Sequence, residues 1–222
     1  MADFRGWPES ALDFYRELEA NNDRAFWSAH KDVYERDVKA PFEALSELVA
    51  EEFGPLRVFR PNRDVRFSKD KSPYKTRCYA VTEGEGGEAY YVEISAQGLV
   101  VATGYWMMAN DQLDRYRRAV DDDGAGPALE KVLAGLAARK LTNEAPGLKT
   151  APRGYPRDHP RVDLLRHKSV AVMRRHPPAR WLQTAAAADR VLEVWRAAAP
   201  MNAWLAAHVG PSTEPPPESR YR

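Results

Sequence analysis

Apolar residues in the first fifty positions recur every three or four residues, which is the period of a helix with one buried face. The first such face predicts a helix over residues 10–20, and the second runs through residues 26–38. Pro41 should kink or restart this second helix, because proline fits only the first turn of a helix. An apolar face then continues to Gly54, so the chain is expected to begin with packed helices.

Beyond residue 56 the pattern changes to alternation and to runs rich in Tyr, Val and Ile, which is typical of strands. Extended segments are predicted at residues 58–59, 65–67, 76–81, 89–95 and 99–106. The last two flank a short Ala-Gln-Gly link, which predicts an antiparallel hairpin. Residues 84–87 are glycine-rich and acidic and are predicted to form a turn.

Helical periodicity returns after residue 109. Helices are predicted over residues 110–120, 127–139, 162–168, 180–199 and 201–209, with a last strand at residues 169–173. Residues 141–160 form a long loop stiffened by proline, and loops of this length in compact domains are often functional. Helices, then a central antiparallel sheet, then further helices predict an α+β fold with the N-terminal and C-terminal helices packed on the sheet.

Length and composition are those of a globular protein. The 222 residues are 44% hydrophobic and 29% charged, and we expect a single α+β domain over residues 1–209. The Pro- and Ser-rich segment 210–222 is predicted to be a disordered tail. No secretory signal and no run of eighteen apolar residues is visible, so we expect a cytoplasmic protein with no membrane partner.

Charge is segregated along the chain although the formal net charge is only +1. Residues 57–77 hold eight cations and two anions, and residues 139–180 hold eleven cations and three anions. If these two basic blocks meet in the fold, they make one positive cleft suited to an anion. The alternative is that each block pairs with an acidic helix, so that the field cancels.

Three runs of residues carry a resemblance to a known family. They are Asn21 to Trp27, Arg63 to Lys75, and the loop segments 147–149, 152–155 and 158–160. With these runs the chain resembles the family called domain of unknown function 2461 over about residues 8–209. The resemblance implies a soluble, single-domain bacterial or fungal protein of this length, and it implies no activity.

The central run, residues 63–75, is the candidate site. On an extended backbone Val65 and Phe67 would face the core, and Asp64 and Arg66 would face solvent. A polar loop after them could present backbone N–H groups, a hydroxyl and ammonium groups to one oxyanion. The candidate anion-binding residues are Arg63, Arg66, Ser68, Lys69, Lys71, Tyr74, Lys75, Trp106, Lys149 and Arg153. In the alternative the segment is a structural hairpin, Arg66 pairs with a carboxylate from an acidic helix, and the lysines are only solvated.

Two residues are candidates for proton transfer. His159 is the best placed histidine for acid–base work at neutral pH, although capping of its loop is the competing interpretation. Asp64 is the second candidate, although neutralising a neighbouring arginine competes with that role. His30 is expected to pack in a helix, and the single cysteine, Cys78, to be buried and inert. No metal-ligand spacing, Walker loop or dinucleotide fingerprint is present, so no metal or cofactor is expected.

Three functions remain open, ranked in this order. The first is an enzyme or binding domain for a phosphorylated or carboxylated small molecule. The second is single-stranded nucleic-acid binding, because basic residues alternate with Phe59, Phe67, Tyr74 and Tyr79, although the neutral net charge disfavours it. The third is a protein-interaction or scaffold role. The sequence gives no oligomeric state.

Overall fold

The computed structural model describes residues 3–83 and 87–214. The chain divides into two compact units, each of which is described by itself. The first unit comprises Met1–Thr82, Tyr90–Ala102 and Arg174–Trp195, and the second comprises Glu83–Ala89, Thr103–Met173 and Arg196–Arg222. The prediction of one domain over residues 1–209 stays a prediction. The predicted turn at 84–87 falls mostly on residues 84–86, which lie outside the described residues.

The predicted α+β fold is confirmed, with a sheet of strand order β1-β2-β3-β4-β6-β5. The strands are β1 (Arg57–Val58), β2 (Arg77–Glu83), β3 (Ala89–Ser95), β4 (Gly98–Tyr105), β5 (Thr142–Asn143) and β6 (Val170–His176). The two edge pairs, β1 with β2 and β5 with β6, are antiparallel, with Val58 opposite Ala80 and Asn143 opposite Val172.

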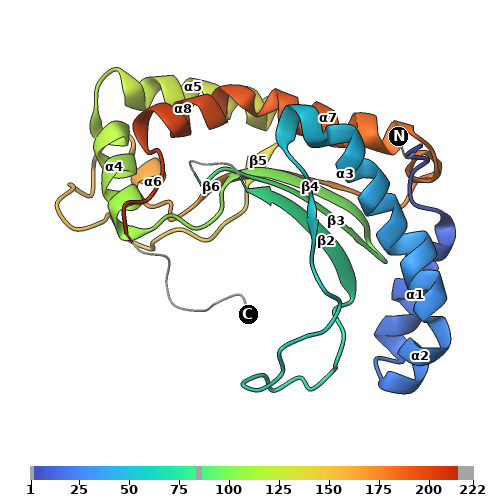
Figure 1. The fold of residues 1–222 in the computed structure, drawn as a ribbon. Coiled ribbons are helices and arrows are strands. Elements are labelled where there is room, and N and C mark those ends of the chain that lie inside the picture. The colour runs from blue at the N-terminus through green and yellow to red at the C-terminus, as the bar shows by residue number, and fades with distance from the viewer. Residues whose placement is uncertain (1–2, 84–86, 215–222) are drawn as a thin grey trace. The chain divides into compact units, whose positions relative to one another are not determined.

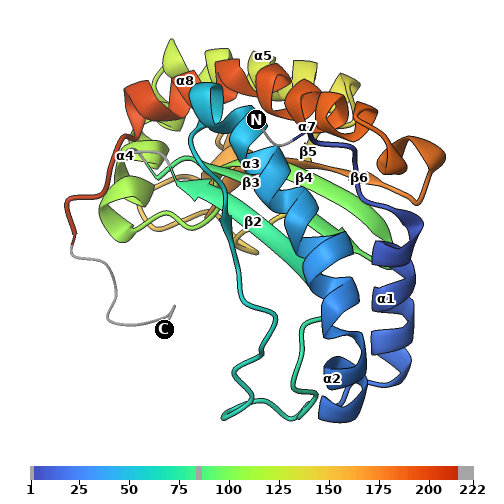
Figure 2. The ribbon, with the colours of Figure 1, turned by 45° about the vertical axis from the view of Figure 1, so that its right-hand side comes forward.

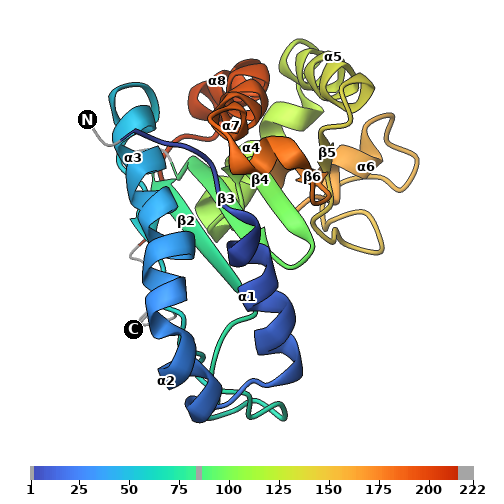
Figure 3. The same cartoon turned by 90° about the vertical axis from the view of Figure 1, so that its right-hand side faces the viewer.

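The first unit begins with helices, as the apolar periodicity predicts. These are α1 (Glu9–Ala20), α2 (Arg24–Val33) and α3 (Ala40–Phe53), and a π-helical turn over Tyr34–Lys39 joins the last two. The Asp23 carboxylate accepts a hydrogen bond from the Phe26 backbone N–H and so caps α2. Pro41 lies in the first turn of α3, where it restarts the helix as expected. Figure 3 shows α1 alongside the rod that α2, the π turn and α3 form together.

The two faces of the sheet in the first unit differ. Cys78, Ala80, Val92 and Ile94 are buried on one face. On that side Tyr90 packs against Phe53 of α3 and against Trp195 of α7 (Ala186–Ala197). Because strand side chains alternate, Arg77, Tyr79, Tyr91 and Glu93 point to the opposite face, where they are only partly covered.

The second unit packs its helices around aromatic side chains that donate hydrogen bonds. Its helices are α4 (Asn110–Asp121), α5 (Ala125–Ala138), α6 (Val162–Leu165) and α8 (Ala199–His208). In Figure 1 α5 and α8 run side by side, with α4 at one end of them. The Trp204 indole donates to the Ala125 carbonyl at 3.0 Å, and the Tyr116 hydroxyl donates to the Leu164 carbonyl at 3.0 Å. The helices predicted at 110–120, 127–139, 162–168 and 201–209 are present with ends shifted by a few residues, whereas the one predicted at 180–199 is divided into a 3-10 turn over Arg180–Gln183 and α7.

The strand predicted at residues 65–67 is wrong. Residues 65–67 form a turn instead of a strand, and the Phe67 side chain is 96% exposed instead of facing the core. The reason is the flanking aspartates: Asp64 accepts a hydrogen bond from the Arg66 backbone N–H, and Asp70 accepts one from that of Ser72. Such local side-chain bonds give the backbone an alternative to strand pairing.

Of the segment predicted to be a disordered tail, residues 210–214 are described and residues 215–222 are not. The Ser212 hydroxyl donates to the Asp111 carboxylate of α4 at 2.7 Å, and the Thr213 backbone N–H does so at 2.8 Å. Among the described helices, none combines the length and apolar character needed to cross a membrane.

Candidate functional site

The candidate run lies on a long hairpin in the first unit, which we call the basic hairpin (residues 57–81). Pairing continues from β1 and β2 into the segment between them, where Phe59 N donates to Tyr79 O and Lys75 N donates to Pro61 O. An isolated bridge between Asn62 and Tyr74 extends it further. Figure 2 shows this segment projecting beyond the strands, with α2 next to its far part.

The hairpin contacts Asn22, just before α2, and Trp27 within α2. The Asn22 side-chain amide donates to the Tyr74 carbonyl at 2.9 Å and accepts from the Tyr74 backbone N–H at 3.1 Å. The Trp27 ring stacks on the Tyr74 ring with centroids 4.3 Å apart and planes 13° apart. Two of the runs that carry the family resemblance therefore meet here. Tyr74 is only 8% exposed, so its ring is occupied by Trp27 and we leave it out of the proposed binding surface.

The two arginines at the tip of the hairpin form ion pairs with aspartates of the same loop. The Arg66 guanidinium donates to both Asp64 carboxylate oxygens, the closest contact being 2.7 Å, and Arg63 pairs with Asp70. Hydrogen bonds from Arg66 lower the pKa of the Asp64 carboxyl to about 2. Arg66 thus has the carboxylate partner that the structural interpretation requires, although that partner is in its own loop and not on an acidic helix.

The other polar residues of the tip serve the loop as well. The Lys71 ammonium donates to the Val65 carbonyl at 2.9 Å, and the Ser68 backbone N–H donates to the same carbonyl at 3.3 Å. Lys69 is exposed, and within the described residues it makes no ion pair. Of the predicted anion ligands at the tip, Lys69 is therefore the least constrained by the loop.

The partly open face of the sheet holds a group of aromatic and charged side chains, most of which lie outside the candidate run 63–75. Phe59, Tyr79 and Tyr91 come from three neighbouring strand segments and stack in a row, with centroids 4.7 Å and 5.7 Å apart. Arg57 lies 4.6 Å from the Phe59 ring centre, and Arg77 pairs with Glu93 at 3.2 Å. We call this group, together with Lys75, the aromatic-basic face.

Lys75 lies at the centre of the aromatic-basic face. Its ammonium nitrogen is 4.8 Å from the Tyr79 ring centre and donates to the Arg60 carbonyl at 2.8 Å and the Tyr79 hydroxyl at 3.3 Å. Burial, followed by the nearby charges of Arg60 and Arg77, lowers the pKa of Lys75. Among the described residues no carboxylate pairs with it. Lys75 is thus a partly desolvated cation with other cations beside it.

Sequence reasoning missed part of this face. Tyr91 and Glu93 are not among the residues predicted from the sequence, and the structure pairs Glu93 with Arg77. Alternation along residues 77–81 and 91–93 was the available signal, because it places these side chains on one face of two strands. Which of the two faces would be covered by helices could not be read from that pattern.

The remaining predicted ligands belong to the second unit. Trp106 is 50% exposed beside Met107, and Lys149 and Arg153 are exposed on the long loop. Whether these residues join the basic hairpin in one cleft stays a prediction.

His159 also belongs to the second unit, and both of its ring nitrogens are engaged. Nδ1 accepts a hydrogen bond from the Arg161 backbone N–H at 3.0 Å, so Nε2 carries the proton and donates to Asp121 at 3.0 Å. The side chain is 9% exposed. With its lone pair used inside the loop, His159 has the geometry of the capping role, and the geometry does not support a general base.

Arg161 is a structural residue that sequence reasoning did not single out. Its guanidinium donates to the Val120 carbonyl at 2.6 Å and the Asp121 carbonyl at 2.9 Å, which satisfies the C-terminal end of α4. Gly126 makes room for it, since a Cβ there would lie 2.5 Å from the Arg161 Nε.

The expectations for His30 and Cys78 agree with the structure. His30 stacks on Phe26 within α2, with centroids 4.1 Å apart. Cys78 is 2% exposed next to the Tyr34 hydroxyl, and burial raises the pKa of its thiol to about 12. No cluster of His, Cys, Asp and Glu that could hold a metal occurs among the described side chains.

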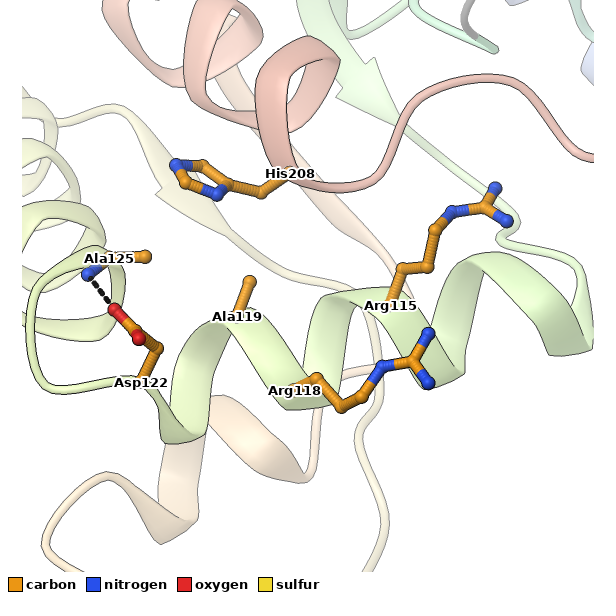
Figure 4. A pocket seen from close by; sticks show the side chains of 6 residues that line it. All are labelled: Arg115, Arg118, Ala119, Asp122, Ala125 and His208. Atoms are coloured by element: carbon orange, nitrogen blue, oxygen red, sulfur yellow. Dashed lines mark hydrogen bonds between the residues drawn. The ribbon is translucent and has the colours of Figure 1, made fainter.

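The second unit has a shallow pocket of about 410 Å³. In Figure 4 the His208 ring lies across from Ala119, Arg115 and Arg118 lie toward one end, and Asp122 lies at the other. Asp122 accepts hydrogen bonds from the Gly124 and Ala125 backbone N–H groups and so is used to cap α5. The pocket contains none of the predicted site residues.

Comparison with known proteins shows the family to which the chain belongs. No curated protein matches the chain. The model of one family, described as a conserved hypothetical protein (DUF2461), matches residues 10–204. This span covers the helices of the first unit, the basic hairpin, the sheet and nearly all of the second unit. The chain therefore belongs to the DUF2461 family, in agreement with the resemblance seen in its motifs.

Proposed function

We propose that the first unit binds an anionic ligand carrying phosphate or carboxylate, and that Lys75 on the aromatic-basic face is its central contact. The observation that carries the proposal is the environment of Lys75, a partly desolvated ammonium group flanked by Arg60 and Arg77. A cation held this way, without a carboxylate among the described residues, gains most from an incoming anion.

The aromatic row supports the same ligand class. Phe59 and Tyr79 are stacked 4.7 Å apart with planes at 24°, close to the spacing of neighbouring strands, so their faces are occupied by each other. Tyr79 lies between Phe59 and Tyr91, so both of its faces are covered. The Tyr79 hydroxyl accepts from Lys75 and the Tyr91 hydroxyl donates to Glu93, so the row positions Lys75 for an anion rather than offering open platforms for stacking.

The geometry supports binding more directly than it supports a reaction. Asp64 is engaged by Arg66 through two oxygens, and its low pKa keeps it a carboxylate at neutral pH. His159 has no free lone pair in its loop. We therefore rank a binding domain ahead of an enzyme for this site.

The test uses inorganic pyrophosphate and citrate as probes, with chloride at equal ionic strength as reference. We expect both polyanions to raise the unfolding midpoint, because a ligand that binds only the folded state stabilises it. Lys75→Met should weaken pyrophosphate binding by roughly tenfold or more, since a hydrogen bond to a charged group contributes about 1.5–3 kcal/mol. Lys75→Arg should retain binding, and Lys31→Met on the exposed side of α2 is the matched control.

Equal midpoints in pyrophosphate, citrate and chloride would overturn the proposal. So would undiminished pyrophosphate affinity in folded Lys75→Met protein. Arg66→Ala is a less decisive variant, because Asp64 already neutralises that arginine.

A further inference from the structure

Phe67 is the most exposed large apolar side chain among the described residues, at 96%. Transfer of such a ring out of water is favourable, yet the fold leaves it exposed at the tip of the basic hairpin. The three aromatic rings of the sheet face stack on one another, whereas Phe67 has both faces in solvent apart from Arg66, 5.9 Å from its centre. This ring is therefore open to stacking.

The loop that carries Phe67 is held in one conformation by its own hydrogen bonds. The carbonyl of Val65 accepts from both Lys71 and the Ser68 backbone N–H, so it closes the turn across Phe67. Asp64 and Asp70 hold the flanking residues with further hydrogen bonds. A loop ordered before binding loses less entropy when a partner arrives, which favours recognition by this ring.

Cations extend from the tip to the base of the hairpin. Lys69 is exposed two positions after Phe67, Lys71 donates to the Val65 carbonyl of the same turn, and Lys75 donates to Tyr79 on the sheet face. Lys69 and Lys75 are six positions apart in the chain, so their backbones lie at most about 20 Å from each other. A polymer with regularly spaced phosphates can contact several lysines spread along such a segment, whereas a single phosphate group contacts one end of it.

We propose that the anionic ligand of the first unit is a single-stranded nucleic acid, whose phosphates contact Lys69, Lys71 and Lys75 while one base stacks on Phe67. The inference rests on the proposed anion-binding function and names its ligand class. Single strands are favoured over a duplex because only an unpaired base can offer its face to a side chain. They are favoured over a lipid surface because the cations follow the length of the hairpin and do not all gather around the ring.

The experiment measures fluorescence anisotropy of fluorescein-labelled 12-nucleotide oligo(dT) and oligo(U) with the full chain between 20 and 200 mM KCl. We expect saturable binding whose logarithm falls linearly with the logarithm of salt concentration. Phe67→Ala should weaken binding by roughly five- to hundredfold, in line with the value of one base stack, and Phe67→Trp should restore it. Lys69→Gln should reduce the salt slope by about 0.7.

The variants are interpretable because Phe67 and Lys69 are exposed, so the unfolding midpoint should not move. If pyrophosphate binds through Lys75 but the oligonucleotides bind no more tightly, or Phe67→Ala has no effect on them, the nucleic-acid inference is wrong and the proposed function stands. Phe67-dependent sedimentation with phosphatidylserine vesicles, without oligonucleotide binding, would also overturn it in favour of lipid. If neither pyrophosphate nor oligonucleotides bind, both proposals fail.

Discussion

Individual side chains of the basic hairpin have different roles although they look alike in the sequence. Phe67 and Tyr74 are both aromatic residues in a basic run, yet one is 96% exposed and the other is stacked on Trp27. The difference comes from partners distant in the chain or from local aspartate turns, which residue type alone does not reveal. The sequence does predict that Asp64 could neutralise an arginine, because Arg66 is two residues away.

His159 provides a test at the residue scale. We expect His159→Ala to lower the free energy of unfolding by about 1–3 kcal/mol, because the Arg161 backbone N–H and the Asp121 carboxylate both lose their partner. Chemical denaturation followed by circular dichroism measures this change.

The control for that variant is Arg157→Ala at an exposed position of the same loop, which should change stability by no more than about 0.5 kcal/mol. An unchanged stability in His159→Ala would show that the two hydrogen bonds are not structural, and the proton-transfer role would regain support.

At the scale of elements, periodicity and proline placement predict the helices well. The restart at Pro41, the hairpin of β3 and β4, and the helices after residue 109 all follow from local pattern. The stretch at residues 59–76 does not, because its tip is set by the turns at Asp64 and Asp70 and its attachment by the contact between Asn22 and Tyr74, which are 52 positions apart. The candidate site shares this limit, since the pairing of strands determines which cations gather around Lys75.

The link between α2 and the hairpin predicts a change in local dynamics. Asn22→Ala removes both side-chain hydrogen bonds to the Tyr74 backbone, so the Tyr74 amide should exchange its hydrogen faster. Native-state hydrogen exchange measures the effect, which we expect to correspond to about 1–2 kcal/mol of local stability.

Asn21→Ala is the comparison variant, because the Asn21 side chain only contacts the Glu17 carbonyl within its own helix end. If both variants protected Tyr74 equally well, the amide of Asn22 would not be what fixes the hairpin.

At the scale of the whole molecule, histidines link stability to pH in both units. Burial, followed by Arg174 and Arg190, lowers the pKa of His176 in the first unit, and burial lowers the pKa of His167 in the second. The unfolded chain therefore binds more protons than the folded one below the ordinary histidine pKa near 6.5. Stability should fall as the pH drops through this range and should not change from this cause above pH 7.5.

Unfolding free energies measured between pH 7.5 and 5.5 test this expectation, since side-chain carboxyls stay ionised in that window. His176→Phe keeps an edge-on ring against Trp181, and His167→Gln keeps an acceptor for Asn143. Each variant should show a smaller loss of stability than the wild type. Identical slopes in all three proteins would contradict the assignment.

The double hydrogen bond from Asn22 has a consequence for handling the protein. Asparagine is a thermolabile residue that ages by losing its amide nitrogen. Deamidation at position 22 would replace the donor facing the Tyr74 carbonyl with a carboxylate oxygen, so two acceptors would then face each other. Old or heated preparations would thus contain a fraction of molecules with a released hairpin, and mass spectrometry of the peptide spanning Asn22 should accompany every binding measurement.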